Sequence, residues 1–274
     1  MRLAYQGEPG AYSEAASLLY SPHAETLPCK TFDEVFDAVV HKKATHGVVP
    51  MENSIGGTIH RNYDLLVDHE IPITGEVELD VVHCLQALPG TKLSDVRTVY
   101  SHPQALAQCE RYLKDLGATV EAVYDTAGGA KLVAEQKLQG AAALASRRAA
   151  EVFGLEVLQE AVQDFEYNIT RFFVIGGSPS AEANKTTIVF ALPSTPGSLF
   201  KALSVFALRD INLSKLESRP IRGRPWEYLF YVDIEARRDE LPLARALTQL
   251  GEFAKWIRVL GTYKGWERKP VVAT

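Results

Sequence analysis

The sequence of 274 residues is poor in cysteine and has neither a long apolar run nor a block of like charges. Its three cysteines, Cys29, Cys84 and Cys109, lie far apart without CxxC spacing. This pattern argues against a disulfide framework or a zinc site and fits a reducing compartment. No stretch approaches the ~18 apolar residues of a membrane-spanning helix, and the N-terminus lacks the apolar core of a signal peptide. We therefore expect a soluble cytoplasmic protein without a membrane partner.

The charges are balanced and spread along the chain. The 29 Lys and Arg residues against 34 Asp and Glu residues give a net charge of −5, without the clustered basic patch that nucleic-acid binding requires. The apolar fraction of 46% is that of a globular protein, and the length allows one large domain or two ordinary ones. We expect no nucleic-acid partner.

Short apolar strands alternate with amphipathic helices over the first 175 residues. One such helix, "TFDEVFDAVVHKK", opens with Thr31 and Glu34 at capping-box spacing. The alternation predicts an α/β fold, with a mostly parallel sheet covered by helices on both faces. The extended stretch 71–89 is too long for one ordinary strand, so we interpret it as a crossing between two α/β lobes, with a second crossing near 160–170. Residues 1–177 form the expected first domain.

A different order of elements follows a stretch rich in small residues, "GGSPSAEANK". Within it, residues 178–184 are the predicted linker. Residues 185–263 then read strand-helix-strand-strand-helix-strand, the order of the ferredoxin-like α+β plait, and residues 264–274 form a tail. A plait leaves one sheet face and one edge uncovered, so we expect pairing with a second copy of the chain.

Four polar clusters stand where strands of the first domain end, the position at which open α/β sheets bind ligands. The first, "YQGEPGAYS" at 5–13, turns into a helix whose free N–H groups suit an anion. It lacks the GxGxxG spacing of a dinucleotide site. The second, "PMENSIGGTIH", offers Asn53 and Ser54 as donors to a carboxylate, and Gly56 and Gly57 allow close approach. A plain connection or a structural turn is the alternative for each.

The other two clusters each have a structural alternative as well. In "SHPQALAQC", Ser101 suits an N-cap and His102 could be first-turn polarity. In "YDTAGGA", Asp125 or Thr126 could cap the helix, while the double glycine permits close approach of a ligand.

The remaining polar signals are few. The pair His83 and Cys84 favours a filled core position over metal or nucleophile chemistry, because neighbours on a strand point to opposite faces. No Ser-His-Asp order, HExxH motif or obvious carboxylate pair occurs. The clusters supply hydroxyls, amides and backbone donors. They predict a site that holds a small polyanion and performs mild proton chemistry without a metal or cofactor.

Thr170 and Arg171 stand at the mouth of a short buried strand in "NITRFFVIGG". The planar fork of Arg171 suits a carboxylate. Alternatively, it points away from Thr170 and pairs with an acidic side chain.

Together these stretches, with "PGSLFKAL" and "LESRP" beyond the linker, resemble the prephenate dehydratase family with an ACT regulatory domain. The resemblance runs in order from about residue 2 to 263. It implies a two-lobed catalytic domain like type II periplasmic binding proteins, which converts prephenate to phenylpyruvate in phenylalanine biosynthesis. The catalytic threonine of the family's Thr-Arg-Phe motif is matched by Thr170. The substrate-binding residues that we predict are Asn53, Ser54, Gly56, Gly57, Thr126, Arg171 and Phe172.

ACT domains generally bind amino acids at dimer interfaces, so the resemblance implies phenylalanine as an effector and a homodimer or homotetramer. The Glu-Ser-Arg-Pro motif is intact, whereas Gly-Ala-Leu-Val is replaced by "GSLF", and Phe200 in place of Val changes the expected pocket. The predicted effector-binding residues are Pro196, Gly197, Ser198, Leu199, Asn212, Glu217, Ser218 and Arg219. An edge-strand ion pair is the alternative for Glu217 and Arg219.

Three alternatives to a prephenate dehydratase remain. Arogenate dehydratase acts on the amino analogue, and "SIGGTIHRNYDLL" resembles its plant-type members. No single residue decides whether the pocket meets a keto oxygen or an ammonium, and the missing transit segment favours a bacterial-type prephenate enzyme. A non-catalytic amino-acid-binding regulator would not need Thr170, and an NAD-dependent dehydrogenase would need a phosphate-binding turn.

Overall fold

The computed structural model describes residues 1–268, which form two compact units. The first unit is Met1–His69 with Val77–Val174, and the second is Glu70–Glu76 with the chain from Ile175 onward. Residues 269–274 of the predicted tail lie outside the described residues. Of the helices between residues 1 and 268, none combines the length and apolar character that a bilayer crossing demands.

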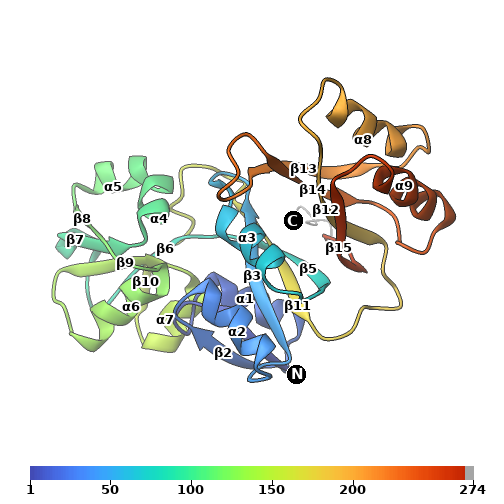
Figure 1. Cartoon of the computed structure of the whole chain (residues 1–274). Helices are drawn as coiled ribbons and strands as arrows, with labels where there is room; N and C mark the ends of the chain where they lie inside the picture. The colour runs from blue at the N-terminus through green and yellow to red at the C-terminus, as the bar shows by residue number, and fades with distance from the viewer. Residues whose placement is uncertain (269–274) are drawn as a thin grey trace. The chain divides into compact units, whose positions relative to one another are not determined.

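The first lobe is built on a mixed sheet with the strand order β5-β11-β3-β1-β2, in which β5 begins and β11 ends among residues assigned to the second unit (Figure 1). Strand β1 pairs in parallel with both β2 and β3, and the short strand β4 pairs with β3. The strands are β1 (Arg2–Gln6), β2 (Glu25–Cys29), β3 (His46–Asn53), β4 (Gly57–Thr58), β5 (Ile73–Asp80) and β11 (Ile169–Gly176), and the helices are α1 (Tyr12–Tyr20), α2 (Phe32–Val40) and α3 (His60–Asp68). As predicted, Thr31 caps α2, accepting a hydrogen bond from the Glu34 N–H.

The second lobe has a five-stranded sheet with the order β10-β6-β9-β7-β8. Its strands are β6 (Cys84–Ala87), β7 (Thr98–Ser101), β8 (Thr119–Ala122), β9 (Ala141–Ala145) and β10 (Glu156–Gln159), and its helices are η1 (Leu93–Asp95), α4 (Pro103–Gln108), α5 (Glu110–Leu116), α6 (Thr126–Glu135) and α7 (Arg147–Phe153). The chain enters this lobe between β5 and β6 and leaves it between β10 and β11.

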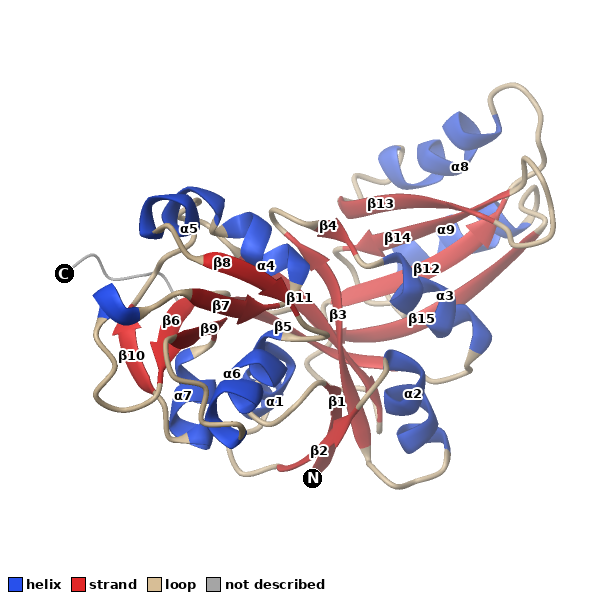
Figure 2. Cartoon of the chain, turned by 90° about the vertical axis from the view of Figure 1, so that its left-hand side faces the viewer, coloured by secondary structure: helices blue, strands red, loops and turns tan. Residues whose placement is uncertain are grey.

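The central strand β9 explains how this lobe packs. Helices α4 and α5 cover one face of the sheet and α6 and α7 cover the other (Figure 2). Alternate residues of "AAALA" enter the two separate cores, with Ala143 in one and Leu144 in the other. A Cβ on Gly129 would lie 2.9 Å from the Tyr100 carbonyl oxygen, so the glycine lets α6 lie against β7.

The second unit contains the predicted plait. Its four strands have the antiparallel order β13-β14-β12-β15. They are β12 (Lys185–Ala191), β13 (Leu213–Pro220), β14 (Tyr228–Ile234) and β15 (Trp256–Lys264), with helices α8 (Ser198–Ala207) and α9 (Leu241–Gly251). Both helices share one apolar core with the sheet, including Phe190, Phe206 and Leu243. The predicted fold class, two α/β lobes and a ferredoxin-like plait, is confirmed.

Two segments depart from what their sequence patterns predict. The apolar spacing of "PQALAQCERYLKDLG" predicts one helix, but the structure breaks it at Cys109, where φ is −120° and ψ is 22°, outside the helical range. The alternation in "WEYLFYVDIEA" predicts Trp226 on the apolar face of a strand, but this residue precedes β14 and is 82% exposed.

Candidate active site

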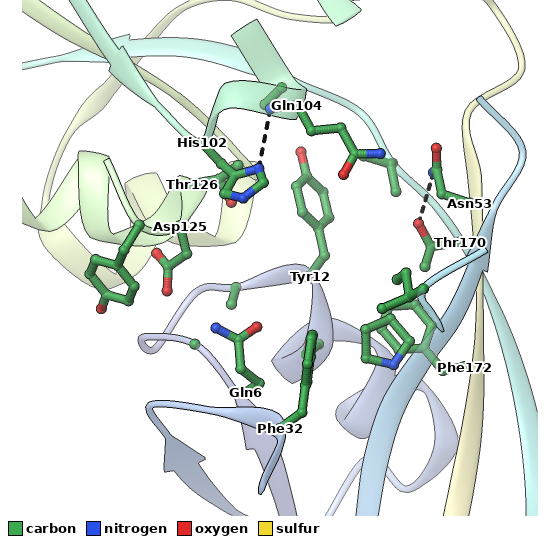
Figure 3. A pocket seen from close by; sticks show the side chains of 18 of the residues that line it. Gln6, Tyr12, Phe32, Asn53, His102, Gln104, Asp125, Thr126, Thr170 and Phe172 are labelled. Carbon is green, nitrogen blue, oxygen red and sulfur yellow. Dashed lines mark hydrogen bonds between the residues drawn. The ribbon is translucent and has the colours of Figure 1, made fainter. Parts of the chain in front are cut away.

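A cavity of about 470 Å³ lies between the two lobes of the first unit (Figure 3). All four polar clusters predicted at strand ends contribute to its wall, as does the start of β11. The residues that line it include Tyr12, Lys30, Phe32, Asn53, His83, His102, Gln104, Gln108, Asp125, Thr126, Thr170 and Phe172. The structure therefore brings together stretches that are far apart in the sequence.

Strand β11 presents Thr170 and Phe172 to this pocket. Thr170 is buried, with 8% of the residue exposed, and it lines the pocket. Arg171 does not line the pocket. Its guanidinium carbon lies 4.7 Å from the centre of the Phe173 ring, as expected for residues i and i+2 on one face of a strand.

The orientation of Asn53 is fixed by the main chain. Its Oδ1 accepts hydrogen bonds from the N–H groups of Ile55 at 3.1 Å and Gly56 at 2.7 Å. The amide nitrogen must therefore be on the other side, where it donates to the Thr170 hydroxyl oxygen at 3.0 Å (Figure 3). Because the Thr170 oxygen accepts this bond, its own hydrogen is left to point elsewhere.

The same reasoning extends through a buried network. Asn53 also donates to Asn168 Oδ1 at 2.7 Å, so Asn168 Nδ2 donates to Gln108 Oε1 at 2.8 Å. Gln108 thus presents an oxygen to His83 Nε2 at 3.0 Å, which places a proton on that nitrogen. Burial lowers the pKa of His83 and favours the neutral ring. The Tyr12 hydroxyl lies 2.9 Å from His83 Nδ1 and 2.8 Å from the Val82 carbonyl oxygen, so these two acceptors share its one proton.

The sequence alone did not reveal this network. His83 fills a buried position, as predicted, and its side chain is also bonded at both ring nitrogens. Gln108, Asn168 and Tyr12 were not predicted as site residues. The sequence signal that could have indicated them is a polar side chain among residues expected to be buried. Buried polar groups nearly always have hydrogen-bond partners, so such residues are candidates for a network.

The turn after β3 is held by its own polar groups. The Ser54 hydroxyl donates to the Tyr167 carbonyl at 3.3 Å and accepts from the Ile169 N–H at 3.0 Å. Gly57 has φ +76°, and a Cβ built on it would meet nothing within 4 Å. A Cβ on Gly56 would lie only 1.6 Å from Gln104 Nε2 of the second lobe. That Ser54, Gly56, Gly57 and Arg171 contact a substrate stays a prediction.

The third cluster differs from its predicted structure. His102 caps α4, because its Nδ1 accepts from the Gln104 N–H at 3.2 Å. Ser101 lies within β7 and donates to the Leu144 carbonyl at 2.6 Å, so the N-cap role predicted for it is wrong. Burial lowers the pKa of His102, which lines the pocket.

The fourth cluster supplies Asp125 as the cap of α6. Its Oδ1 accepts from the Gly128 N–H and its Oδ2 accepts from the Glu8 N–H of the first lobe at 3.1 Å. Burial raises the pKa of Asp125. Thr126 begins the helix and lines the pocket, as its predicted role requires.

The pocket suits an anion although it has little formal charge. Helices α1, α2 and α6 each have their first residue on its wall, and helix N-termini attract negative groups. Among its described lining residues, Lys30 is the only lysine or arginine and Asp125 the only carboxylic acid. Apolar walls from Phe32 and Phe172 complete it. Such a site can bind a small ring that carries carboxylates.

The predicted effector residues lie in the second unit. Gly197, with φ +78°, precedes α8, next to exposed Pro196 and Leu199 and half-buried Ser198. On and beside β13, Asn212 donates to Glu235 at 2.6 Å and Glu217 faces Lys215 at 3.8 Å. Ser218 is exposed on β13 and Arg219 is half-buried. Effector binding by these residues stays a prediction.

The fold and pocket define a two-lobed α/β protein that binds a small molecule between its lobes and carries a ferredoxin-like second domain. Family models extend this class. The model of prephenate dehydratase matches residues 3–180, and that of the ACT domain matches residues 186–252. The chain therefore belongs to the prephenate dehydratase family, as its motifs indicate, and is a dehydratase with an ACT domain.

Individual relatives agree with this membership. Arogenate dehydratase/prephenate dehydratase 2, chloroplastic, of Arabidopsis thaliana is 50% identical over 276 residues, covering 96% of this chain and 72% of that protein. The structure of prephenate dehydratase from Arthrobacter aurescens in complex with L-Phe has a TM-score of 0.89 at 30% identity, covering 99% of this chain and 92% of that one. A structure described as GqqA, a novel type of quorum quenching acylase, has a TM-score of 0.90 at 36% identity, covering 97% and 98%.

Proposed function

We propose that the pocket between the lobes converts prephenate to phenylpyruvate, with loss of water and carbon dioxide, and so serves phenylalanine biosynthesis. The observation that carries the chemistry is the hydrogen bond from Asn53 to Thr170. It leaves the Thr170 hydroxyl as a donor at the pocket wall.

Prephenate carries a carboxylate and a hydroxyl at opposite positions of a non-aromatic ring. The electron pair of the carbon–carboxylate bond moves into the ring as carbon dioxide leaves. The carbon–oxygen bond breaks with its electron pair on oxygen, and the hydroxide so released takes up one proton, supplied in net terms by solvent, to become water. Aromatisation makes this step strongly downhill, so the protein needs mainly to stabilise the departing oxygen. Thr170 is too weak an acid to protonate it in advance. We therefore infer hydrogen bonding from Thr170 that is concerted with departure.

Binding follows from the rest of the wall. The N-termini of α1, α2 and α6, with Lys30, are positioned to attract carboxylates, and Phe32 and Phe172 can pack against the ring. Asn53 acts in this proposal by holding Thr170, although the sequence suggested it as a carboxylate anchor. Thr126, at the start of α6, stays a candidate contact.

Arogenate is the second candidate substrate. Curated relatives at 46–50% identity are named arogenate dehydratases, several of them prephenate dehydratases too. Its reacting ring is the same, so the same donor would serve.

Amide hydrolysis, which the description of GqqA gives to that protein, would need a base beside the nucleophile, and the partner of the Thr170 hydroxyl is the Asn53 amide.

The test is purified protein given prephenate or arogenate without added cofactor, with formation of phenylpyruvate or phenylalanine followed over time. We expect turnover of at least one of the two. If neither product forms with a folded protein, the proposed function is wrong.

We further propose that L-phenylalanine binds the ACT domain and shifts the catalytic domain toward a less active state, which requires different affinities for two states. The complex of the Arthrobacter aurescens enzyme with L-Phe supports this proposal. In the proposed arrangement of this chain, residues 1–177 form the catalytic domain, residues 178–184 form the linker, and residues 185–263 bind the effector. The protein is then a cytoplasmic homodimer or homotetramer.

A further inference from the structure

The charged groups of the pocket are one of each sign, Lys30 and Asp125, among the described residues that line it. A neighbouring acid, Glu8, does not line the pocket, and its carboxylate accepts from the Tyr124 hydroxyl and from Lys131 Nζ at 3.1 Å. A ligand bound in the pocket would therefore be near one carboxylate, that of Asp125.

Asp125 is held in place but not neutralised. Both of its oxygens accept backbone N–H groups, from Gly128 and from Glu8. The described residues give Asp125 no direct ion pair, although Lys131 and His102 act on its charge, and the residue is 9% exposed. A carboxylate has about four acceptor positions, and the Tyr124 side chain also interacts with Asp125, so at least one position remains for a ligand. Figure 3 shows Asp125 on one side of the pocket and Thr170 on the other.

This placement matters because of the substrate's shape. The hydroxyl carbon and the carbon that carries the side chain are at opposite ends of the six-membered ring. With the hydroxyl at Thr170, the side chain extends toward the side of Asp125. A side chain with a keto group and a carboxylate offers no donor to Asp125 and adds a like charge. A side chain with an ammonium and a carboxylate offers a charge-assisted hydrogen bond.

We propose that Asp125 selects the substrate whose side chain is a 2-amino acid, arogenate, over the 2-keto acid prephenate. Lys30 and the helix N-termini take the carboxylate, so the two charges of the pocket match the zwitterionic side chain. The inference rests on the proposed function, because it assumes the dehydratase reaction with Thr170 at the hydroxyl end, and it keeps prephenate as a substrate that the pocket converts less efficiently than arogenate. Asp125 is a specificity-determining residue in this account.

The experiment compares kcat/KM for arogenate and prephenate in the wild type, Asp125→Asn and Asp125→Ser. Asparagine and serine both remain good N-caps, so either variant removes the charge and keeps an acceptor for α6. The matched control is Glu8→Gln, which neutralises the adjacent acid outside the pocket. Thermal unfolding checks that each variant is folded.

We expect the wild type to prefer arogenate, and both Asp125 variants to lower the arogenate-to-prephenate ratio of kcat/KM at least tenfold, chiefly through the KM for arogenate. Glu8→Gln should leave that ratio within twofold. Equal losses with both substrates, or an unchanged ratio, would show that Asp125 only caps α6 and would overturn the inference while the proposed function stands. A folded wild type inactive on both substrates would overturn both.

Discussion

The Asn53 amide nitrogen lies 3.0 Å from the Thr170 hydroxyl oxygen, and the strands that carry these residues, β3 and β11, are neighbours in one sheet. Two main-chain N–H groups fix the Asn53 amide, so the direction of this bond is set by the backbone. The relationship makes the donor role of Thr170 testable.

Replacing Thr170 with Val keeps the shape of the side chain and removes the donor. We expect kcat to fall about 10²-fold or more, the range of a lost proton donor, with a small change in unfolding temperature. Thr170→Ser should retain more activity than Thr170→Val. Steady-state kinetics measure this, and a valine variant as active as the wild type would contradict the hydroxyl's role.

Replacing Asn53 with Asp exchanges the amide donor for an acceptor. Thr170 would then donate to the new carboxylate and no longer to the substrate, so we expect kcat to fall about 10²-fold although Thr170 is present. A double-mutant cycle with Thr170→Val separates this from general damage, because coupled residues do not give additive losses. Fully additive losses would mean that the two side chains act independently.

His83 should make stability fall at acidic pH. Burial lowers the pKa of this side chain in the folded protein, so below the ordinary His value of about 6.5 the unfolded chain takes up a proton that the folded ring resists. Stability is full above that pH and declines as pH falls toward the lowered pKa. The His83→Gln variant keeps an N–H donor for Gln108 and lacks this titration.

Urea unfolding at several pH values measures the effect. Burial also lowers the pKa of His46 and of His102, so the informative quantity is the difference in slope between wild type and His83→Gln. Identical slopes would refute the assignment to His83.

A side chain at Gly56 is predicted to disturb the pocket wall. In Gly56→Ala the new Cβ would overlap Gln104 Nε2 of the facing lobe and crowd Asn53 Oδ1, so the Gln104 side chain would have to turn away from its place on the wall. We expect kcat/KM to fall about tenfold or more, since small misplacements at a site are costly. Gln104→Ala in the same chain should restore part of the loss if the clash is its cause. No rescue would point to the backbone instead.

Phenylalanine sensitivity should depend on Glu217 in the ACT domain. Glu217→Ala removes a carboxylate that could accept the effector's ammonium, so we expect the inhibition constant for phenylalanine to rise about tenfold, as for a lost charge-assisted bond. Activity without effector should change less than twofold. Glu252→Ala is the control, because this exposed acid at the end of α9 lies outside the predicted effector set. Equal sensitivity of wild type and Glu217→Ala would remove Glu217 from that set.

Much of the fold was predictable because it follows from local periodicity. The two lobes and the plait arise from apolar patterns that any one element shows by itself, and the Thr31 cap of α2 is a three-residue signal. The break at Cys109 was not predictable, because the apolar spacing continues through the point where the residue leaves the helical range. Trp226 continues the alternation of apolar residues in the sequence, but strand β14 begins only at Tyr228.

The site residues that stand in sequence motifs were predictable. The residues that reach the site only through tertiary contacts were not. Thr170, Asn53 and Thr126 stand in recognisable stretches and reach the same pocket. Gln108 and Asn168 meet across 60 positions of sequence, and no spacing rule anticipates such a pair. The side of β11 on which Arg171 lies is likewise set by a contact, that of its guanidinium with the Phe173 ring.

The two lobes touch on either side of the cavity, at Gly56 with Gln104 and at Glu8 with Asp125. Parting of these contacts would move the lobes through solvent. If release of the aromatic acid depends on that motion, we expect solvent viscosity to slow the overall cycle even when the bond-breaking step is fast.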